Sequence, residues 1–271
     1  MSWQARRGFI LNRAALDPVA SGGGGSDAAW TTSFLARTSG LDAAHTSVVK
    51  TMMNAMAAAG LDAKCDVAWL TALPGANGNL NLKSSSYTLT NHGATHTNDL
   101  GYTGDGAAQY VDTTFSPSTN GAASSATSVA WTFFQSATAD FSNGPGMAIA
   151  NGDFANYMQA ADFGSDLSGR LLNLAFGAAV SEPAGMTTAS LTSTLDTYHN
   201  TANVEHNATL TGKNAAFSTG TLTLLGNSNV GFSAGPIGFA GVFAGLSSSD
   251  VTALYNTVHT ALHALNATGY P

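Results

Sequence analysis

The chain has few charged residues and almost no cysteine. Asp, Glu, Lys and Arg make up 9% of its 271 residues, whereas an average soluble domain carries about 25%. Cys65 is the one cysteine, so no disulfide can form within the chain and folding does not depend on an oxidising compartment. We expect Cys65 to be a small buried apolar residue.

Long apolar runs are also missing from the sequence. No stretch reaches the roughly 20 apolar residues that a membrane-spanning helix needs. Residues 8–11 follow two arginines but are too short for the apolar part of a secretory signal. We therefore expect that the protein does not insert into a membrane. We also expect that it is synthesised in the cytoplasm without a signal peptide.

The net charge of −7 is unevenly distributed. Residues 1–64 carry six basic side chains against four aspartates, and residues 65–271 carry three basic side chains against twelve acidic ones. The acidic body argues against nucleic acid as a partner, because phosphates would be repelled. The basic beginning, with Arg6, Arg7 and Arg13, is suited to an acidic partner surface.

Serine, threonine, asparagine and glycine supply the polarity that charge does not. An apolar content of 44% is enough for a core, and the surface is then mainly hydroxyl and amide. Such a surface is suited to hydrogen bonding with sugars, although it is equally typical of an ordinary β protein.

We divide the chain into three parts. Residues 1–26 are a basic arm with a flexible glycine linker. This arm either anchors the protein to a partner or is merely a disordered terminus. Residues 27–64 are a connecting segment that contains a helix, and residues 65–271 form the main domain. Within the connecting segment, residues 30–36 have the composition of a strand.

Two helices are expected, over about 42–60 and 247–266. Asp42 and Ser247 are suitable N-caps, and Gly60 ends the first helix. The first helix has an apolar stripe at helical spacing, whose three methionines are more typical of core packing than of a binding surface.

Many short strand-like segments follow one another, separated by turns rich in Asn, Gly, Ser and Pro. They show no alternation of strand and helix, which favours an all-β sandwich or jelly roll. The segments are 66–73, 80–83, 87–90, 109–113, 128–135, 146–150, 156–160, 170–175, 188–195, 202–210, 221–225 and 238–244.

Residues 97–115 are the most distinctive segment. Two glycine-bearing turns flank an aromatic residue, and the short strand 109–113 alternates polar and apolar side chains, as in an antiparallel sheet. Together with Leu-Asn-Leu-Lys at 80–83, Gly-Tyr-Thr-Gly-Asp-Gly at 101–106 and a closing helix from Leu246, this segment resembles phage and prophage proteins. Those proteins carry a concanavalin A-like lectin/glucanase (LamG-type) jelly roll.

The resemblance covers roughly residues 41–268. It implies a concanavalin A-like jelly roll of two antiparallel sheets with flanking helices, in a spike or fibre protein of a phage or gene transfer agent. The implied function is binding of host cell-surface polysaccharide on the virion surface, with other virion proteins held by the arm. Weak sites would act together in a homo-oligomer, a trimer or a pentamer. A structural virion module and a polysaccharide-degrading enzyme remain as alternatives.

The glucanases with this fold use two glutamates around an aspartate on one strand. This chain has only Glu182 and Glu205, and no Glu-x-Asp-x-Glu pattern. Retaining hydrolysis needs two carboxylates about 5–5.5 Å apart. We therefore expect a protein that is not an enzyme, with no catalytic residues.

The binding residues that we expect are aromatic and amide groups on loops and strand ends. An aromatic ring can stack on a sugar while amides bond its hydroxyls, although the same rings equally suit a strand end that covers a core. The candidates are Asn151, Asp153, Asn156, Tyr157, Tyr198, His199 and Asn200.

We expect no metal or other cofactor. Calcium at Asn151 and Asp153, or at Asp162 and Asp166, is the alternative, because clustered loop oxygens suit that ion. Turn formation explains such residues more simply. The same explanation applies to three further aspartates, Asp99, Asp105 and Asp112.

His259 and His263 would share one helix face at a spacing that suits zinc. No third ligand is evident near them in the sequence.

Overall fold

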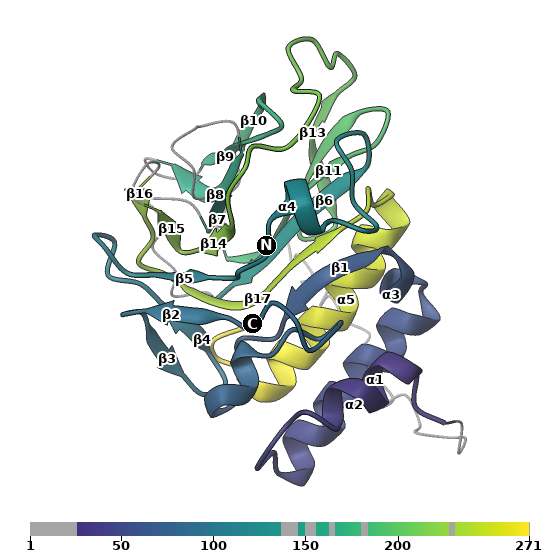
Figure 1. The fold of residues 1–271 in the computed structure, drawn as a ribbon, viewed down its shortest axis with the longest axis vertical. Coiled ribbons are helices and arrows are strands. Elements are labelled where there is room, and N and C mark those ends of the chain that lie inside the picture. Colours follow the sequence, from purple (N-terminus) through teal and green to yellow (C-terminus); the bar gives the residue numbers. More distant parts are fainter. Residues whose placement is uncertain are drawn as a thin grey trace, which may run out of the picture.

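The computed structural model describes residues 26–136, 146–149, 156–162, 166–179, 184–227 and 231–270. Two antiparallel sheets face each other, and helices cover the outer side of the larger sheet (Figure 1). This arrangement confirms the predicted sandwich with flanking helices.

The larger sheet contains eight strands within the described residues. Seven of them form one continuous order, and the eighth pairs with one of these seven. In spatial order its strands are β13 (Ala202–Asn207), β12 (Leu195–His199), β11 (Gly185–Leu191), β6 (Val129–Gln135), β17 (Pro236–Phe243), β4 (Gly101–Thr103) and β3 (Thr95–Thr97), with β1 (Cys65–Trp69) beside β17.

The smaller sheet contains seven strands within the described residues. In spatial order they are β10 (Leu174–Ala179), β9 (Asp166–Leu171), β8 (Tyr157–Asp162), β7 (Met147–Ile149), β14 (Leu222–Leu224), β5 (Tyr110–Asp112) and β2 (Thr90–His92). A separate two-stranded ribbon follows β14 in the chain and is formed by β15 (Gly226–Asn227) and β16 (Gly231–Phe232).

The helices begin where local side chains can cap them. Asp42 accepts a hydrogen bond from the His45 N–H at the start of α2, and Ser247 forms a capping box with Asp250 at the start of α5. Both predicted N-caps are confirmed. The helical elements are α1 (Ala29–Leu35), α2 (Ala43–Ala58), α3 (Leu61–Lys64), α4 (Pro117–Asn120) and α5 (Ser248–Leu265), with a 3₁₀ turn at Gly75–Asn79.

One core fills the space between the two sheets. Trp131 and Phe133 of β6 point into it from the larger sheet, and Val111 of β5 and Leu224 of β14 point into it from the smaller one. All four side chains are almost fully buried. The side chains that alternate with them must therefore face the opposite side of each sheet.

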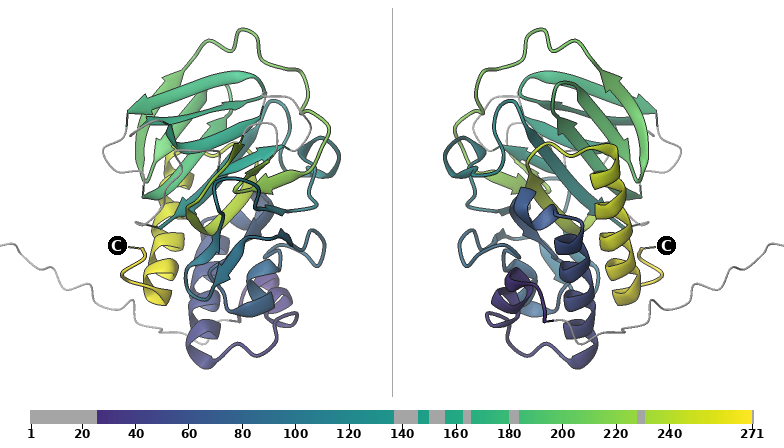
Figure 2. Two further views of the ribbon diagram at one scale, coloured as in Figure 1. Left: turned by 90° about the vertical axis from the view of Figure 1, so that its left-hand side faces the viewer. Right: turned by 90° about the vertical axis from the view of Figure 1, so that its right-hand side faces the viewer.

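A second core lies between the outer side of the larger sheet and the helices (Figure 2). Met52, Met53 and Met56 of α2 are buried there together with Leu254 of α5. This confirms that the methionine stripe belongs to a core. Cys65 is buried in the same layer, as expected.

The segment 30–36 is a helix, and the strand predicted there is wrong. Trp30 and Phe34 are one turn apart and both are buried in the second core. The indole Nε1–H of Trp30 donates to the Met53 carbonyl at 2.9 Å. Packing on α2 therefore outweighs the strand propensity of the aromatic and threonine side chains.

The strand predicted at 170–175 is interrupted by a hairpin turn. Leu172 and Asn173 both have positive φ, at 52° and 67°, and Leu171 pairs with Leu174 across the turn. Two residues of this conformation form the tight turn that joins β9 to β10. The predicted strand 188–195 contains a similar break, because it spans the turn between β11 and β12.

The predicted strand at 80–83 contributes one isolated bridge, between Trp69 and Asn81. Among the described helices, none is long and apolar enough to cross a membrane.

Candidate functional site

The outer face of the smaller sheet carries a cluster of exposed and partly exposed aromatic side chains near one edge. In β5, Val111 is buried between the sheets, so Tyr110 and Asp112 on either side of it point outward. The edge strand β2 pairs His92 with Tyr110 and Thr90 with Asp112. These four side chains therefore share one face.

The Tyr110 ring contacts two other rings of this cluster. The ring centroids of His92 and Tyr110 are 4.3 Å apart, with 7° between their planes. Phe232 of β16 lies on Tyr110 at 6.2 Å and 38°. His92 and Thr90 are exposed, and the other members are partly exposed. We call His92, Tyr110, Phe232, Thr90 and Asp112 the aromatic face.

Two glycines in the segment 101–106 allow close backbone contacts, one with β17 and one with the residue that follows Phe232. Gly101 has a φ of 100°, and a Cβ built there would lie 2.0 Å from the Ile237 carbonyl oxygen. A Cβ on Gly104 would lie 2.2 Å from the Ser233 carbonyl oxygen. Only glycine allows contacts this close, and the Gly104 contact lets the chain after Phe232 approach the segment before Tyr110.

The turn before β5 is held by Asp105. Its Oδ1 accepts hydrogen bonds from three backbone N–H groups, those of Ala107, Ala108 and Gln109, at 2.9–3.0 Å. These bonds lower the pKa of Asp105 below its ordinary value. The carboxylate thus fixes the turn from which Tyr110 emerges, which confirms the structural role predicted for Asp105.

The other two turn aspartates bond differently. Asp112 Oδ1 accepts the local Thr114 N–H at 2.8 Å, whereas Asp99 Oδ1 forms a long-range bond with the His45 ring on α2.

Flat rings and a few hydrogen-bonding groups define the chemistry of the aromatic face. Tyr110 and Phe232 present partly exposed rings to a flat apolar ligand surface. Asp112, Thr90 and His92 add a carboxylate, a hydroxyl and an imidazole beside those rings. The arrangement is suited to a ligand that has an apolar face and hydroxyl groups at its edge.

Tyr157 is on the same side of the smaller sheet as the aromatic face. It pairs with Ala148 on β7 and with Arg170 on β9, and its side chain is partly exposed. Three strand spacings of about 4.8 Å place Tyr157 roughly 14 Å from Asp112 along one row. The Ala148 and Thr223 side chains between them are buried, so the partly exposed Tyr157 is separate from the aromatic face.

Asn156 is buried, with 1% of its surface exposed. Its Oδ1 accepts the Leu172 N–H at 2.8 Å and its Nδ2 donates to the Ser218 Oγ at 3.2 Å. Both ends of the amide therefore fix the turn between β9 and β10 and a neighbouring loop. This corrects its expected place on a binding surface.

The segment from Tyr198 to Asn200 belongs to the larger sheet and lies apart from the aromatic face. Tyr198 is 4% exposed and is buried in the second core, so its ring offers no face to a ligand. Asn200 has a φ of 55° and its Oδ1 accepts the Met186 N–H at 2.9 Å. His199 is partly buried next to them. The three residues form a strand end, and they do not meet Tyr157.

The remaining predicted site residues lie outside the described residues. They are Asn151, Asp153, Arg6, Arg7 and Arg13. Within the described residues, no group of three or more His, Cys, Asp or Glu side chains is arranged to hold a metal ion. His259 and His263 stack at 5.8 Å on α5.

Sequence reasoning missed His92 and Phe232 as members of a site. Tyr110 and Asp112 were part of the distinctive segment 97–115, and their alternation with Val111 was the available signal. The pairing of β2 with β5 and the approach of β16 are long-range contacts, which the local sequence does not encode.

Neither the family models nor the curated proteins contain a match to this sequence. Among solved structures, the chain is similar to domain 4 of AbnA, a GH43 extracellular arabinanase from Geobacillus stearothermophilus, in complex with arabinotriose. The TM-score is 0.51 at 11% identity, over 71% of this chain and 98% of that chain.

The chain is also similar to the binding domain of botulinum neurotoxin DC in complex with rat synaptotagmin II. Here the TM-score is 0.50 at 13% identity, over 73% of this chain and 52% of that chain. The present chain thus matches about half the length of the toxin domain. These likenesses show the fold. They support the jelly-roll sandwich expected from the sequence.

Proposed function

We propose that this protein binds a cell-surface polysaccharide through the aromatic face, without cleaving it, and that it does so on the surface of a phage-like particle. The observation that carries the proposal is the ring cluster on the outer face of the smaller sheet, where His92 is exposed and stacks on the partly exposed ring of Tyr110, and the partly exposed Phe232 is tilted beside it.

A pyranose ring has an apolar face of C–H groups and a rim of hydroxyls. The Tyr110 and Phe232 rings match the apolar face, and stacking of this kind uses rigid groups that lose little conformational entropy. Asp112 and Thr90 are placed to bond the hydroxyl rim. The surface is shallow, so each copy would bind weakly and several copies on one particle would raise the avidity.

The similarity to domain 4 of AbnA supports this function, because that domain was solved in complex with arabinotriose. The hydroxyl- and amide-rich composition suits the same ligand class. The virion location, the homo-oligomer and the contact with other virion proteins rest on the sequence resemblance to phage proteins, and are part of the proposal.

The carboxylates of the aromatic face support the proposal of binding without cleavage. Hydrolysis of a glycosidic bond uses two carboxyl groups about 5–9.5 Å apart, and the aromatic face as defined contains one, that of Asp112. Glu205 lies on β13, where its Oε2 accepts the Gly177 N–H at 2.6 Å. It therefore serves as a link between the edges of the two sheets.

The direct test is binding of the purified protein to encapsulated and capsule-free cells, with free capsular polysaccharide as competitor. We expect capsule-dependent binding that the polysaccharide competes away. Tyr110→Ala should reduce it about tenfold, equivalent to about 1.4 kcal/mol. Tyr255→Ala is the matched control, because it removes a partly exposed ring on the helical side. Equal binding to both cell types would overturn the proposal and favour a purely structural module.

A further inference from the structure

Arg170 on β9 presents a positive charge on the outer face of the smaller sheet. Residues 65–271 contain two lysines and one arginine, all within the described part of the chain. Lys83 and Lys213 are partly buried, and each donates to a backbone carbonyl, at 2.6 Å and 2.8 Å. Arg170 is exposed, and no described carboxylate forms an ion pair with it. Its charge is therefore available to a ligand.

The guanidinium of Arg170 is oriented by the hairpin turn that follows β9. Its Nη1 donates to Asn173 Oδ1 at 3.3 Å, and Asn173 Nδ2 donates in turn to the Gly212 carbonyl at 3.3 Å. A guanidinium has five N–H donors in a fixed planar fork, and this bond uses one of them. The fork matches the two oxygens of a carboxylate, which it can bind through two parallel hydrogen bonds.

Tyr157 and Ser168 lie beside Arg170 on the same face. Tyr157 of β8 is the register partner of Arg170, and Ser168 precedes Arg170 by two residues on β9. The next residue after each register partner, Met158 and Leu171, is buried between the sheets, so the partners point outward. Cross-strand neighbours have Cβ atoms about 4.5–5.5 Å apart. An aromatic ring, a guanidinium and a hydroxyl are therefore within reach of one sugar unit.

The edge strand β10 leaves this group of side chains open. Ala175 is the register partner of Arg170, and Gly177 is the register partner of Ser168. Both residues are exposed, and neither has a side chain long enough to cover the guanidinium. A ligand can therefore approach Arg170 from the edge of the sheet.

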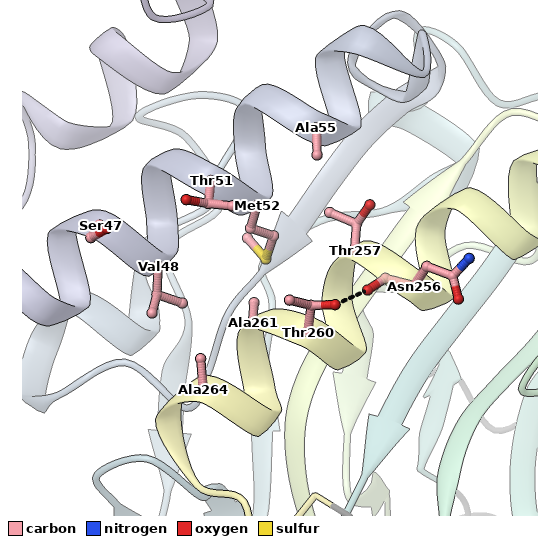
Figure 3. Close-up of a pocket in the computed structure, with 10 residues that line it drawn as sticks. All are labelled: Ser47, Val48, Thr51, Met52, Ala55, Asn256, Thr257, Thr260, Ala261 and Ala264. Carbon is pink, nitrogen blue, oxygen red and sulfur yellow. Dashed lines mark hydrogen bonds between the residues drawn. The ribbon is translucent and has the colours of Figure 1, made fainter. Parts of the chain in front are cut away.

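The groove between α2 and α5 on the helical side has the opposite character (Figure 3). It has a volume of about 290 Å³, and none of the ten described residues that line it is charged. A carboxylate would find no cation in this groove. An anionic ligand is therefore better matched by the outer face of β9.

We propose that Arg170 binds the carboxylate of an acidic sugar unit, with the Tyr157 ring against the apolar side of that unit and the Ser168 hydroxyl at its rim. This inference rests on the proposed function and adds the substrate class, a polysaccharide that contains uronic acid. The twelve acidic side chains of residues 65–271 repel a polyanion, so an acidic chain gains affinity only where a cation is presented locally. Four strand spacings separate Arg170 from Asp112, roughly 19 Å along one row. The contact is therefore additional to the aromatic face.

The test compares polygalacturonate oligomers with their methyl esters, because the ester removes the charge and keeps the sugar chain. Titration calorimetry with the full-length protein at about 0.15 M salt measures both. We expect the acid form to bind about tenfold more tightly than the ester. Arg170→Gln should reduce binding of the acid form to the level of the ester. Arg170→Lys keeps the charge without the planar fork and should restore only part of the difference.

Lys50→Gln is the matched control, because it removes one positive charge from α2 on the helical side. It should keep the full preference for the acid form. A preference that persists in Arg170→Gln would overturn the inference, and so would a parent protein without any preference. Dextran sulfate that competes as strongly as polygalacturonate would also overturn it, because binding would then depend on charge alone.

Capsule-dependent binding to cells tests the proposed function separately. A parent protein that binds cells through their capsule but shows no preference for the acid form would overturn this inference alone. Equal binding to encapsulated and capsule-free cells would instead overturn the proposed function, whatever the result with the two probes.

Discussion

The imidazole of His92 lies flat on the phenol ring of Tyr110, with 4.3 Å between centroids and 7° between planes. The two residues are register partners on the edge strand β2 and its neighbour β5. Such a cross-strand pair holds the Tyr110 ring in one orientation before any ligand arrives. The fixed orientation of the Tyr110 ring, and not only the presence of two rings, should therefore matter for binding.

This relationship predicts different effects for two substitutions of His92. His92→Ala leaves Tyr110 free to rotate and should weaken polysaccharide binding about tenfold, or about 1.4 kcal/mol. His92→Phe keeps a flat partner and should stay within about threefold of the parent protein. Titration calorimetry with purified capsular polysaccharide measures both. Equal losses in the two variants would show that the imidazole contacts the ligand through its nitrogens.

Gly101 is predicted to be indispensable for the packing of β4 against β17 in the larger sheet. Gly101→Ala combines a φ of 100° with a Cβ only 2.0 Å from the Ile237 carbonyl oxygen, so we expect a loss of about 3 kcal/mol or more. Gly40→Ala is the control, because its φ is also positive at 67° but nothing lies within 4 Å of the new Cβ. That variant should lose about 1 kcal/mol. Urea unfolding of both variants tests the comparison, and similar losses would contradict it.

Asn156 should stabilise the protein without contributing to binding. Asn156→Ala leaves the buried Leu172 N–H without its side-chain acceptor, which should lower the free energy of unfolding by about 2 kcal/mol. Polysaccharide affinity of the folded variant should not change. The exposed Asn203→Ala is a suitable control, with an expected effect within about 0.5 kcal/mol. A loss of affinity in Asn156→Ala without a loss of stability would restore Asn156 to the binding site.

His45 should make stability depend on pH. Its imidazole bonds to Asp42 Oδ1 at 2.8 Å and to Asp99 Oδ1 at 2.9 Å. Partial burial lowers the pKa of His45, but the bonds to Asp99 and Asp42 outweigh this effect, and the pKa is raised above 6.5. The stabilising contribution is therefore complete below pH 6.5 and is lost as the pH rises through the folded-state pKa.

Thermal unfolding at a series of pH values measures this contribution. The melting temperature should fall as the pH rises above 6.5, and His45→Gln should remove most of that slope. The pKa of Asp42 is lowered by hydrogen bonds from His45, so its contribution is lost in acid and does not overlap this range. An unchanged slope in His45→Gln would assign the pH dependence to other groups.

Local signals were sufficient to predict several parts of the structure. Asp42 and Ser247 were identified as helix caps because a cap needs only residues within one turn. The sandwich followed from the rhythm of short strands and turns. The strand predicted at 30–36 was wrong because Trp30 and Phe34 obtain their burial from α2, a contact that the local sequence does not show.

The faces of the strands could not be predicted in the same way. Tyr110 and Tyr198 both lie on short strands with alternating side chains, yet one is partly exposed and the other is buried. The difference arises because helices cover the outer side of the larger sheet, on which Tyr198 lies. A strand's own sequence shows that its side chains alternate between two faces. Which of the two faces is buried depends on elements that are distant in the sequence.

The three-layer order of helices, larger sheet and smaller sheet gives the molecule a back and a front (Figure 1). Asp27 contacts α2 in the helical layer at the back, and the aromatic face lies on the smaller sheet at the front. A copy held through its first residues would consequently turn its rings away from the support. Neighbouring copies on one support would then all display the same side to an approaching surface.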